Sequence, residues 1–236
     1  MIHRLASRQR SRIIKTTPAV ELPISLQEVK SHLGIPDSDE DEDTNLIGRI
    51  RAATVSCERY TRRSFVNATY TMFMDRFPGK PLPWWDGVRQ GADTELTDLT
   101  SEIIIVNPPL FSVTFVKAHK QDGTETTVSS SDYLVDTAGE PGRIALKVTK
   151  SWPTDSLRSI NGVEVEFIAG YGPVGSDVDE AIRQALLITV ADLHVNKSGS
   201  PARFEKVGES SISRFSPEEI PLPAKNLLST YKDWHV

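Results

Sequence analysis

Two stretches of the chain repeat apolar residues at the spacing of an amphipathic helix. In "TNLIGRIRAATVSCERYTRR" the apolar stripe begins at Leu46 and ends at Tyr60, which predicts a helix of about five turns. In "DVDEAIRQALLITVADLHVNK" a second stripe runs from Val178 to Leu193, and Asp177 is the predicted N-cap. Both predicted helices begin with acidic residues, which complement the helix dipole.

A shorter helix is predicted for "PISLQEVKSHLGIP", because both of its ends carry recognisable signals. Ser25 and Glu28 have the spacing of a capping box, and Ile24 and Val29 have the spacing of a hydrophobic staple. Gly34 supplies a left-handed residue at the end, and the proline that follows prevents continuation. We therefore expect a compact helix that ends just before the acidic run.

From position 67 onward the pattern changes from helical spacing to strands. Strands are predicted in "ATYTMFMDRF", "EIIIVNPPL", "FSVTFVKAHKQDGTETTV", "DYLVDTAGEPGRIALK" and "GVEVEFIAGYG". The third of these contains Asp122-Gly123, a pair typical of a hairpin turn. In the last, Val163, Val165 and Phe167 share one face and the intervening glutamates share the other. Together they predict one antiparallel sheet of roughly six short strands.

The order of these elements predicts an α+β fold: a small helical bundle with an inserted antiparallel β subdomain and an extended C-terminal tail. "AKNLLSTYKDW" predicts a short helix at the end of that tail, and "AGYGPVG" a turn from the last strand into the second long helix. The predicted parts are a basic N-terminal arm (1–20), a helical part (21–66), the β subdomain (67–172) with a long loop (78–101), a bundle helix (173–196) and the tail (197–236).

Composition narrows the class of protein. The chain has 236 residues, of which 38% are hydrophobic and 25% charged, so it can bury a normal core. Its only cysteine, Cys57, excludes an internal disulfide and a multi-cysteine zinc site, and this favours a reducing compartment. Because Cys57 lies on the apolar stripe, we expect a core residue and no nucleophile. The best apolar run, "AIRQALLITVADL", is broken by charged residues, so we expect a soluble protein without membrane contact.

Charge is unevenly distributed along the chain, although the net charge is only −5. The first 17 residues contain no acid, and such a segment could bind phosphate or an acidic protein surface. A solvated, disordered terminus and an organelle transit peptide remain alternatives. The basic residues of this arm are Arg4, Arg8, Arg10, Arg12 and Lys15.

The run "PDSDEDED" places six carboxylates in seven consecutive positions. Its alternating aspartates resemble the start of a calcium loop, but Glu42 and Gly48 stand where an EF-hand needs glycine and a bidentate glutamate. Adventitious divalent binding stays open, and we predict a negatively loaded helix start with a cap near Ser38 or Asp39. The surplus charge is a candidate acidic surface, repulsive or partner-facing, made by Asp37, Asp39, Glu40, Asp41, Glu42 and Asp43.

No motif in the sequence indicates catalysis, a metal or a cofactor. The chain lacks a G-x-S-x-G elbow, a phosphate-binding loop and a G-x-G-x-x-G motif. None of the five histidines lies within four residues of another, so no helical zinc pair exists in the sequence. A carboxylate pair assembled from distant positions is still possible. We predict no enzyme, no catalytic or metal residues and no cofactor.

A long polar segment between the first two predicted strands contains adjacent tryptophans, Trp84 and Trp85. A loop of this length in a compact domain is usually functional or mobile. One indole is expected to pack on the sheet, and the other is a candidate partner contact, although simple anchoring of the loop would explain both.

Taken in order, these motifs resemble the phage head-tail connector family, the adaptor or head-completion proteins of long-tailed phages of gp6-like and gp8-like type. The resemblance rests on "PISLQEVKSHLGI", "ERYTRRSF", "YTMFMDRFP", "VNPPLFSVTFVKAHKQDGT", "DYLVD", "GRIAL", "VEVEFIAGYG" and "AIRQALLITVADLH". It covers residues from about Leu22 to Asn196 and resumes at "IPLPAKNLLSTYKD". We do not map the basic arm or the Trp84-Trp85 loop onto elements of this family.

The resemblance implies a structural virion protein at the head-tail interface, assembled in the host cytoplasm. It would form a ring of about a dozen copies under the portal protein, extend the DNA channel and offer a docking surface to the next neck or tail-completion protein. DNA would be present only as the passing genome, and acidic residues in the lumen would repel it. The tail would contact the portal or a neighbouring subunit through Phe215, Leu227, Leu228, Tyr231 and Trp234.

Two other functions remain open at the level of sequence. A DNA-binding protein would use the basic arm and would show strongly salt-dependent duplex binding. A metal-dependent hydrolase would use carboxylates and would gain stability from divalent ions.

Overall fold

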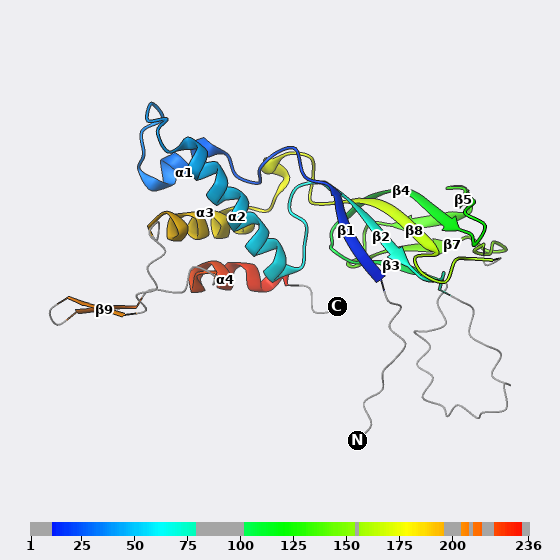
Figure 1. The fold of residues 1–236 in the computed structure, drawn as a ribbon. Coiled ribbons are helices and arrows are strands. Elements are labelled where there is room, and N and C mark those ends of the chain that lie inside the picture. Colours follow the sequence, from blue (N-terminus) through cyan, green and yellow to red (C-terminus); the bar gives the residue numbers. More distant parts are fainter. Residues whose placement is uncertain are drawn as a thin grey trace, which may run out of the picture. The chain divides into compact units, whose positions relative to one another are not determined.

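The computed structural model of the protein describes residues 11–78, 102–153, 156–195, 204–207, 210–213 and 220–232 (Figure 1). Its elements divide into two compact units. The β unit consists of the segment up to Pro18 together with Ala68–Ala169, and the helical unit of Ala19–Asn67 together with Gly170–Val236. The described residues form four α-helices and antiparallel sheets, so the predicted α+β class is confirmed.

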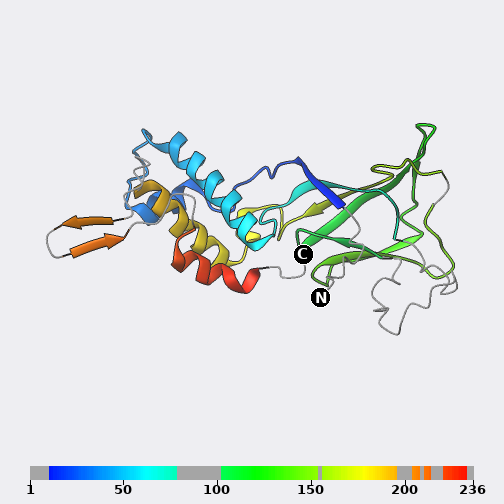
Figure 2. The ribbon, with the colours of Figure 1, turned by 60° about the horizontal axis from the view of Figure 1, so that its bottom comes forward.

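In the helical unit, three helices pack against α3. Figures 1 and 2 both place α4 alongside α3, in agreement with the contacts between them. The core between the helices contains Ile50, Cys57, Ile182 and Leu186, each of them fully buried. The helices are α1 (Leu26–Leu33), α2 (Asp43–Thr61), α3 (Glu180–Val195) and α4 (Leu222–Leu228), with short 3-10 turns η2 (Gly175–Asp177) and η3 (Ser229–Tyr231).

The predicted signals around α1 are confirmed. The Ser25 side chain accepts a hydrogen bond from the Glu28 backbone N–H, and the Glu28 carboxylate accepts one from the Ser25 N–H at 2.7 Å. Gly34 has φ of 70°, the left-handed conformation that ends the helix. Ile24 and Val29, the predicted staple, are each 1% exposed.

The other two helix starts differ from prediction. Helix α2 begins at Asp43, after Glu42, and not near Ser38 or Asp39, because Asp39 N–H bonds to the Pro36 carbonyl in a turn of its own. Asp177, the predicted cap of α3, instead closes η2, where its carboxylate accepts from the Val174 N–H at 3.2 Å. Asp179 takes the capping position, accepting from the Ala181 N–H at 3.0 Å.

In the β unit the described strands form two sheets, so the prediction of a single sheet is wrong. Pro108 and Pro109 separate β3 from β4, and neither offers a backbone N–H to a ladder, so "EIIIVNPPL" cannot continue as one strand. The hairpin predicted at Asp122-Gly123 is confirmed, with Gly123 at φ 84°. The five-stranded sheet has the order β1 (Ser11–Thr17), β2 (Ala68–Met74), β8 (Val163–Ala169), β4 (Leu110–His119) and β5 (Glu125–Thr127), and the three-stranded sheet the order β3 (Ile103–Ile105), β7 (Gly142–Leu146) and β6 (Tyr133–Asp136).

Two further strand regions were not predicted. Strand β1 pairs with β2 at the edge of the larger sheet, although its residues are exposed except for the half-buried Ile13. A hairpin of β9 (Phe204–Val207) and β10 (Ser210–Ser213) lies in the predicted tail (Figure 2). The short helix predicted near the end of that tail is present as α4. In the described residues, no helix has the length and apolar character to cross a membrane.

Candidate functional site

The acidic run is held in place by a buried lysine of α1. Lys30 is only 3% exposed, and its Nζ lies 2.6 Å from Asp43 Oδ1. The same ammonium group donates to the backbone carbonyls of Asp39 at 2.8 Å and Asp37 at 3.3 Å. One lysine therefore fixes both the start of α2 and the path of the loop before it.

The six carboxylates of the run have two different roles. Glu42 and Asp43 are half-buried, and Glu42 Oε2 lies 3.8 Å from Arg49 Nη1 and 3.6 Å from His194 Nδ1. The remaining four side chains are exposed. We call these the acidic loop: Asp37, Asp39, Glu40 and Asp41. Within the loop, Asp39 Oδ1 accepts the Asp41 backbone N–H at 3.3 Å, and all four carboxylates are accessible to a partner.

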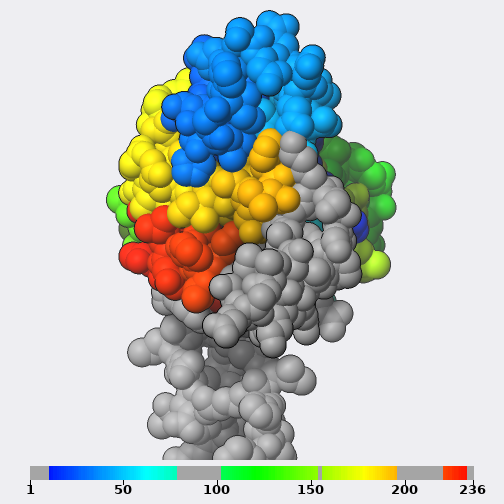
Figure 3. Space-filling view, turned by 90° about the vertical axis from the view of Figure 1, so that its left-hand side faces the viewer, coloured from blue at the N-terminus to red at the C-terminus, as the bar shows by residue number. Residues whose placement is uncertain are grey.

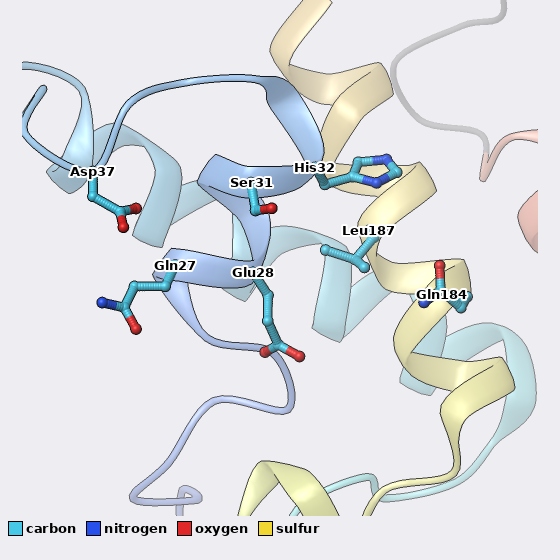
Figure 4. Close-up of a pocket in the computed structure, with 7 residues that line it drawn as sticks. All are labelled: Gln27, Glu28, Ser31, His32, Asp37, Gln184 and Leu187. Atoms are coloured by element: carbon cyan, nitrogen blue, oxygen red, sulfur yellow. The ribbon is translucent and has the colours of Figure 1, made fainter.

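A shallow, open depression lies beside the acidic loop (Figure 4). Arg183 of α3 forms an ion pair with Glu28 at its edge. Burial opposes ionisation of Glu28, but hydrogen bonds from Ser25 and the Arg183 guanidinium outweigh it and lower the pKa of the Glu28 carboxyl. The open shape offers no enclosure for a small molecule. The lining residues come from α1, the following loop and α3: Gln27, Glu28, Ser31, His32, Asp37, Gln184 and Leu187.

In the described part of the chain, no group of three His, Cys, Asp or Glu side chains is arranged to hold a metal ion. The acidic loop itself spreads its carboxylates into solvent. His119 of the β unit is a polar residue that is only 8% exposed, and the sequence gave no signal of this burial. Its Nε2 lies 2.7 Å from Glu164 Oε2 and its Nδ1 3.5 Å from Glu125 Oε1, so its contacts join β4 to both neighbouring strands.

The C-terminal helix completes the core of its own unit. Ala224 and Leu228 are fully buried, and Ile220 just before the helix is 7% exposed. Leu228 was predicted to contact a partner, and this is corrected: its side chain is enclosed by the helical unit itself. Leu227, by contrast, is 36% exposed. Figure 3 shows α4 (red) and the α1 region (blue) on the surface with α3 (yellow to orange) between them.

Beyond α4 the chain contacts the last turn of α2 and the residues that follow it. Arg63 Nε donates to the Tyr231 carbonyl at 2.5 Å, and the Lys232 Nζ lies 5.1 Å from the centre of the Tyr60 ring. Burial and a hydrogen bond to Asp179 raise the pKa of the Tyr231 phenol to about 12. Tyr231 is thus half-buried against its own unit, and its predicted role as a partner contact remains a prediction.

Several predicted contact residues lie outside the described residues: Arg4, Arg8, Arg10, Trp84, Trp85, Phe215 and Trp234. Of the basic arm, Arg12 and Lys15 are described, and both stand exposed on β1. The Lys15 Nζ lies 5.4 Å from the centre of the Tyr70 ring on the neighbouring strand. For residues 11–17 the alternative of a disordered terminus is therefore wrong, because this segment pairs with a sheet.

The single cysteine is confirmed as a core residue. Cys57 is fully buried, and its Sγ lies 3.8 Å from the Thr189 hydroxyl. Burial raises the pKa of the Cys57 thiol to about 11. Because the thiolate is the nucleophile, a buried thiol with this pKa is inert near neutral pH.

We predict that a disulfide-forming thiol reagent at pH 8 will modify native Cys57 at least about 100-fold more slowly than the urea-unfolded chain. Absorbance of the chromophore that the reagent releases measures the rate of modification in the native chain and in the unfolded chain. The matched control is the variant Cys57→Ala/Ser56→Cys, because position 56 is exposed on the same helix and its thiol should react rapidly in the folded protein. Equal rates for Cys57 in the native and unfolded chain would contradict its burial.

The chain is similar to a known protein family in sequence and to several solved structures in fold. The family model described as "Phage gp6-like head-tail connector protein" matches residues 23–107, which confirms the resemblance predicted from the sequence. No curated protein matches the sequence.

Among solved structures, a chain in the neck of an empty gene transfer agent (GTA) particle, computed with C6 symmetry, is 16% identical with a TM-score of 0.66, covering 95% of this chain and 97% of that one. A chain in the virion of the native GTA particle is 15% identical with a TM-score of 0.64, covering 95% and 96%. A third, in the neck of the native particle with C12 symmetry, is 17% identical with a TM-score of 0.59, covering 96% and 97%. At these identities the likeness concerns the fold.

Proposed function

We propose that this chain, which matches the gp6-like head-tail connector family over residues 23–107, is a structural adaptor of the head-tail interface of a virus-like particle. The observation that carries the proposal is the family match, supported by a fold shared over nearly the whole chain with proteins in particle necks. In this role the protein is a part of the virion neck, and it is assembled in the host cytoplasm. It acts by assembly and not by catalysis.

The proposed assembly is a ring of about twelve copies beneath the portal protein. Symmetry of C6 and C12 in the related necks supports a ring. One face of the ring docks on the portal, the other receives the next neck or tail-completion protein, and the genome passes through the centre without being gripped. A net charge of −5 suits a channel that repels phosphate.

Within each copy we propose a helical bundle that carries an inserted β subdomain and a C-terminal tail. Apart from β1, which precedes α1, the strands of the β unit lie between α2 and α3 in the sequence, which supports an inserted subdomain. The tail contributes α4 to the bundle core, so only its outward-facing residues remain for the portal or a neighbouring copy. Leu227 is such a residue, because it lies on α4 and is partly exposed.

The test is assembly with the portal of the same particle. We expect the purified full-length chain to sediment as a small species alone and to form rings on portal particles, visible by negative-stain electron microscopy and counted by mass photometry. If the chain does not bind portal particles that are themselves intact under the conditions of the experiment, the proposed function is overturned. Binding of single copies without a ring would overturn the proposed ring.

A further inference from the structure

The side of α2 that faces away from the core has an unusual surface. Arg51, Val55 and Arg59 follow one another at steps of four residues, so they lie in one row along the helix. Both arginines are exposed, and Val55 is 49% exposed although it is apolar. The core-facing stripe, which includes Ile50 and Cys57, lies on the opposite side. The helix thus presents a second face that the other described residues leave exposed.

This face is both basic and accessible to another chain. Gly48, Ala52 and Ser56 beside the row are exposed and small, and a Cβ added at Gly48 would meet no atom within 4 Å. The nearest acid on the helix, Glu58, is half-buried and accepts the Phe65 backbone N–H at 3.0 Å. We call Gly48, Arg51, Ala52, Val55, Ser56 and Arg59 the arginine face.

A complementary group exists on the same unit, near the N-terminal end of the helix that carries the face. The acidic loop precedes the start of α2 at Asp43, Arg51 lies 8 residues further along the helix, and Arg59 lies 16 residues further along. At 1.5 Å per residue these separations are roughly 12 Å and 24 Å, against a screening length of about 8–10 Å in ordinary salt. Within one molecule the charge of the loop is therefore partly screened at Arg51 and almost fully screened at Arg59.

We propose that the acidic loop of one copy docks on the arginine face of the next copy, and this rests on the proposed ring function. Each copy then donates one loop and offers one face, which is the head-to-tail contact that closed rings use. Lys30 holds the loop in a fixed path, so little conformational entropy is lost on docking. Val55 supplies an apolar centre, and the small residues around it let the partner backbone approach closely.

Duplex DNA is the other chemistry that would fit a row of arginines, and the second copy fits better. Each copy carries one acidic loop with four exposed carboxylates and one arginine face, so loops and faces are equal in number in a ring. The face also centres on a valine, whereas contacts to phosphate need no apolar centre. Charge pairing of this kind sets the register between subunits and excludes wrong arrangements.

The test uses charge reversal in the full-length chain in the presence of the portal. The face-reversed chain carries Arg51→Glu and Arg59→Glu, and the loop-reversed chain carries Asp37→Lys and Glu40→Lys. A third chain carries all four substitutions, and Glu21→Lys is the control, because Glu21 is exposed in the helical unit outside the acidic loop. Circular dichroism confirms that each variant is folded, and mass photometry counts the copies per portal.

Each reversed chain alone places like charges together, so we expect the concentration for half-maximal ring formation to rise at least about tenfold. The fourfold variant, and an equal mixture of the two reversed chains, restore the opposite pairing and should recover rings. The control should assemble as the wild type does.

Rings of wild-type yield from both reversed chains would overturn the proposed contact while leaving the ring function intact. A loss of ring formation that neither the fourfold variant nor the mixture repairs would overturn the proposed contact as well. If the wild-type chain retains duplex DNA and only the face-reversed chain loses it, the arginine face would be assigned to DNA. If the wild-type chain itself forms no ring, the contact and the ring function both fail.

Discussion

Replacing Leu228 by alanine should lower the free energy of unfolding of the helical unit by about 2–5 kcal/mol, because a fully enclosed leucine leaves a cavity that the core refills only in part. The effect is large because α4 has only seven residues and is too short to persist without its packing. Ala224 and Leu228 are the two residues that α4 itself buries in this core.

The adjacent Leu227 provides the matched control, since it has the same side chain on the same helix but is 36% exposed. Leu227→Ala should cost less than about 1 kcal/mol. Urea unfolding followed by helical circular dichroism measures both values. If the two variants lose stability equally, α4 does not dock in the manner described here. The comparison also separates fold from function, because only Leu227 retains surface that a portal or a neighbouring copy could use.

The helices could be predicted from the sequence because their signals are local. The capping box of Ser25 and Glu28, the glycine stop and the 3.6-residue stripe of α2 each depend on residues within a few positions of one another. The N-cap of α3 was assigned to Asp177 although it is Asp179, because tertiary contacts decide which of the two aspartates caps the helix. A Cβ at Gly172 would stand 2.1 Å from Asp177 Oδ2, so the glycine leaves room for Asp177 to close η2, and Asp179 is left as the cap.

The sheets were predicted less well, since strand pairing depends on residues distant in the sequence. Strand β1 has no apolar alternation, and its existence depends on pairing with β2 more than fifty residues later. The bond between Thr16 and Thr71 hydroxyls, 2.7 Å long, is one such distant contact. Likewise, the run of strands gave no sign of whether β3, β6 and β7 would join the larger sheet or form their own.

The acidic run illustrates the same limit at a candidate site. The sequence indicated that six carboxylates exceed what one helix start needs, but it could not divide them into structural and surplus acids. That division is made by Lys30, which precedes the run by seven residues and appears in the sequence as an ordinary basic residue near the end of α1. A buried ammonium group must find anionic or carbonyl partners, and here the loop folds back to provide them.

Replacing Lys30 by methionine, which keeps the length of the side chain, should therefore destabilise the helical unit by roughly 2–4 kcal/mol. The change leaves the Asp43 carboxylate without its partner at 2.6 Å and frees the carbonyls of Asp37 and Asp39. The cost falls somewhat below that of a fully buried pair, because the Asp43 side chain keeps 27% exposure and can recover some hydration. Urea unfolding measures the loss, with Lys225→Met on α4 as a control expected to change stability by less than about 0.5 kcal/mol.

The double variant Lys30→Met/Asp43→Leu decides whether the loss comes from an unpaired charge. Removing both partners of a buried pair is much less harmful than removing one, so the double variant should regain at least half of the lost stability. A double variant no more stable than Lys30→Met would show that the lysine acts through the loop carbonyls and not through Asp43. In either case hydrogen exchange in residues 36–42 should accelerate, because the loop has lost its anchor. Since the proposed contact between copies needs that loop in a fixed path, ring formation should weaken even under conditions where the Lys30→Met chain remains folded.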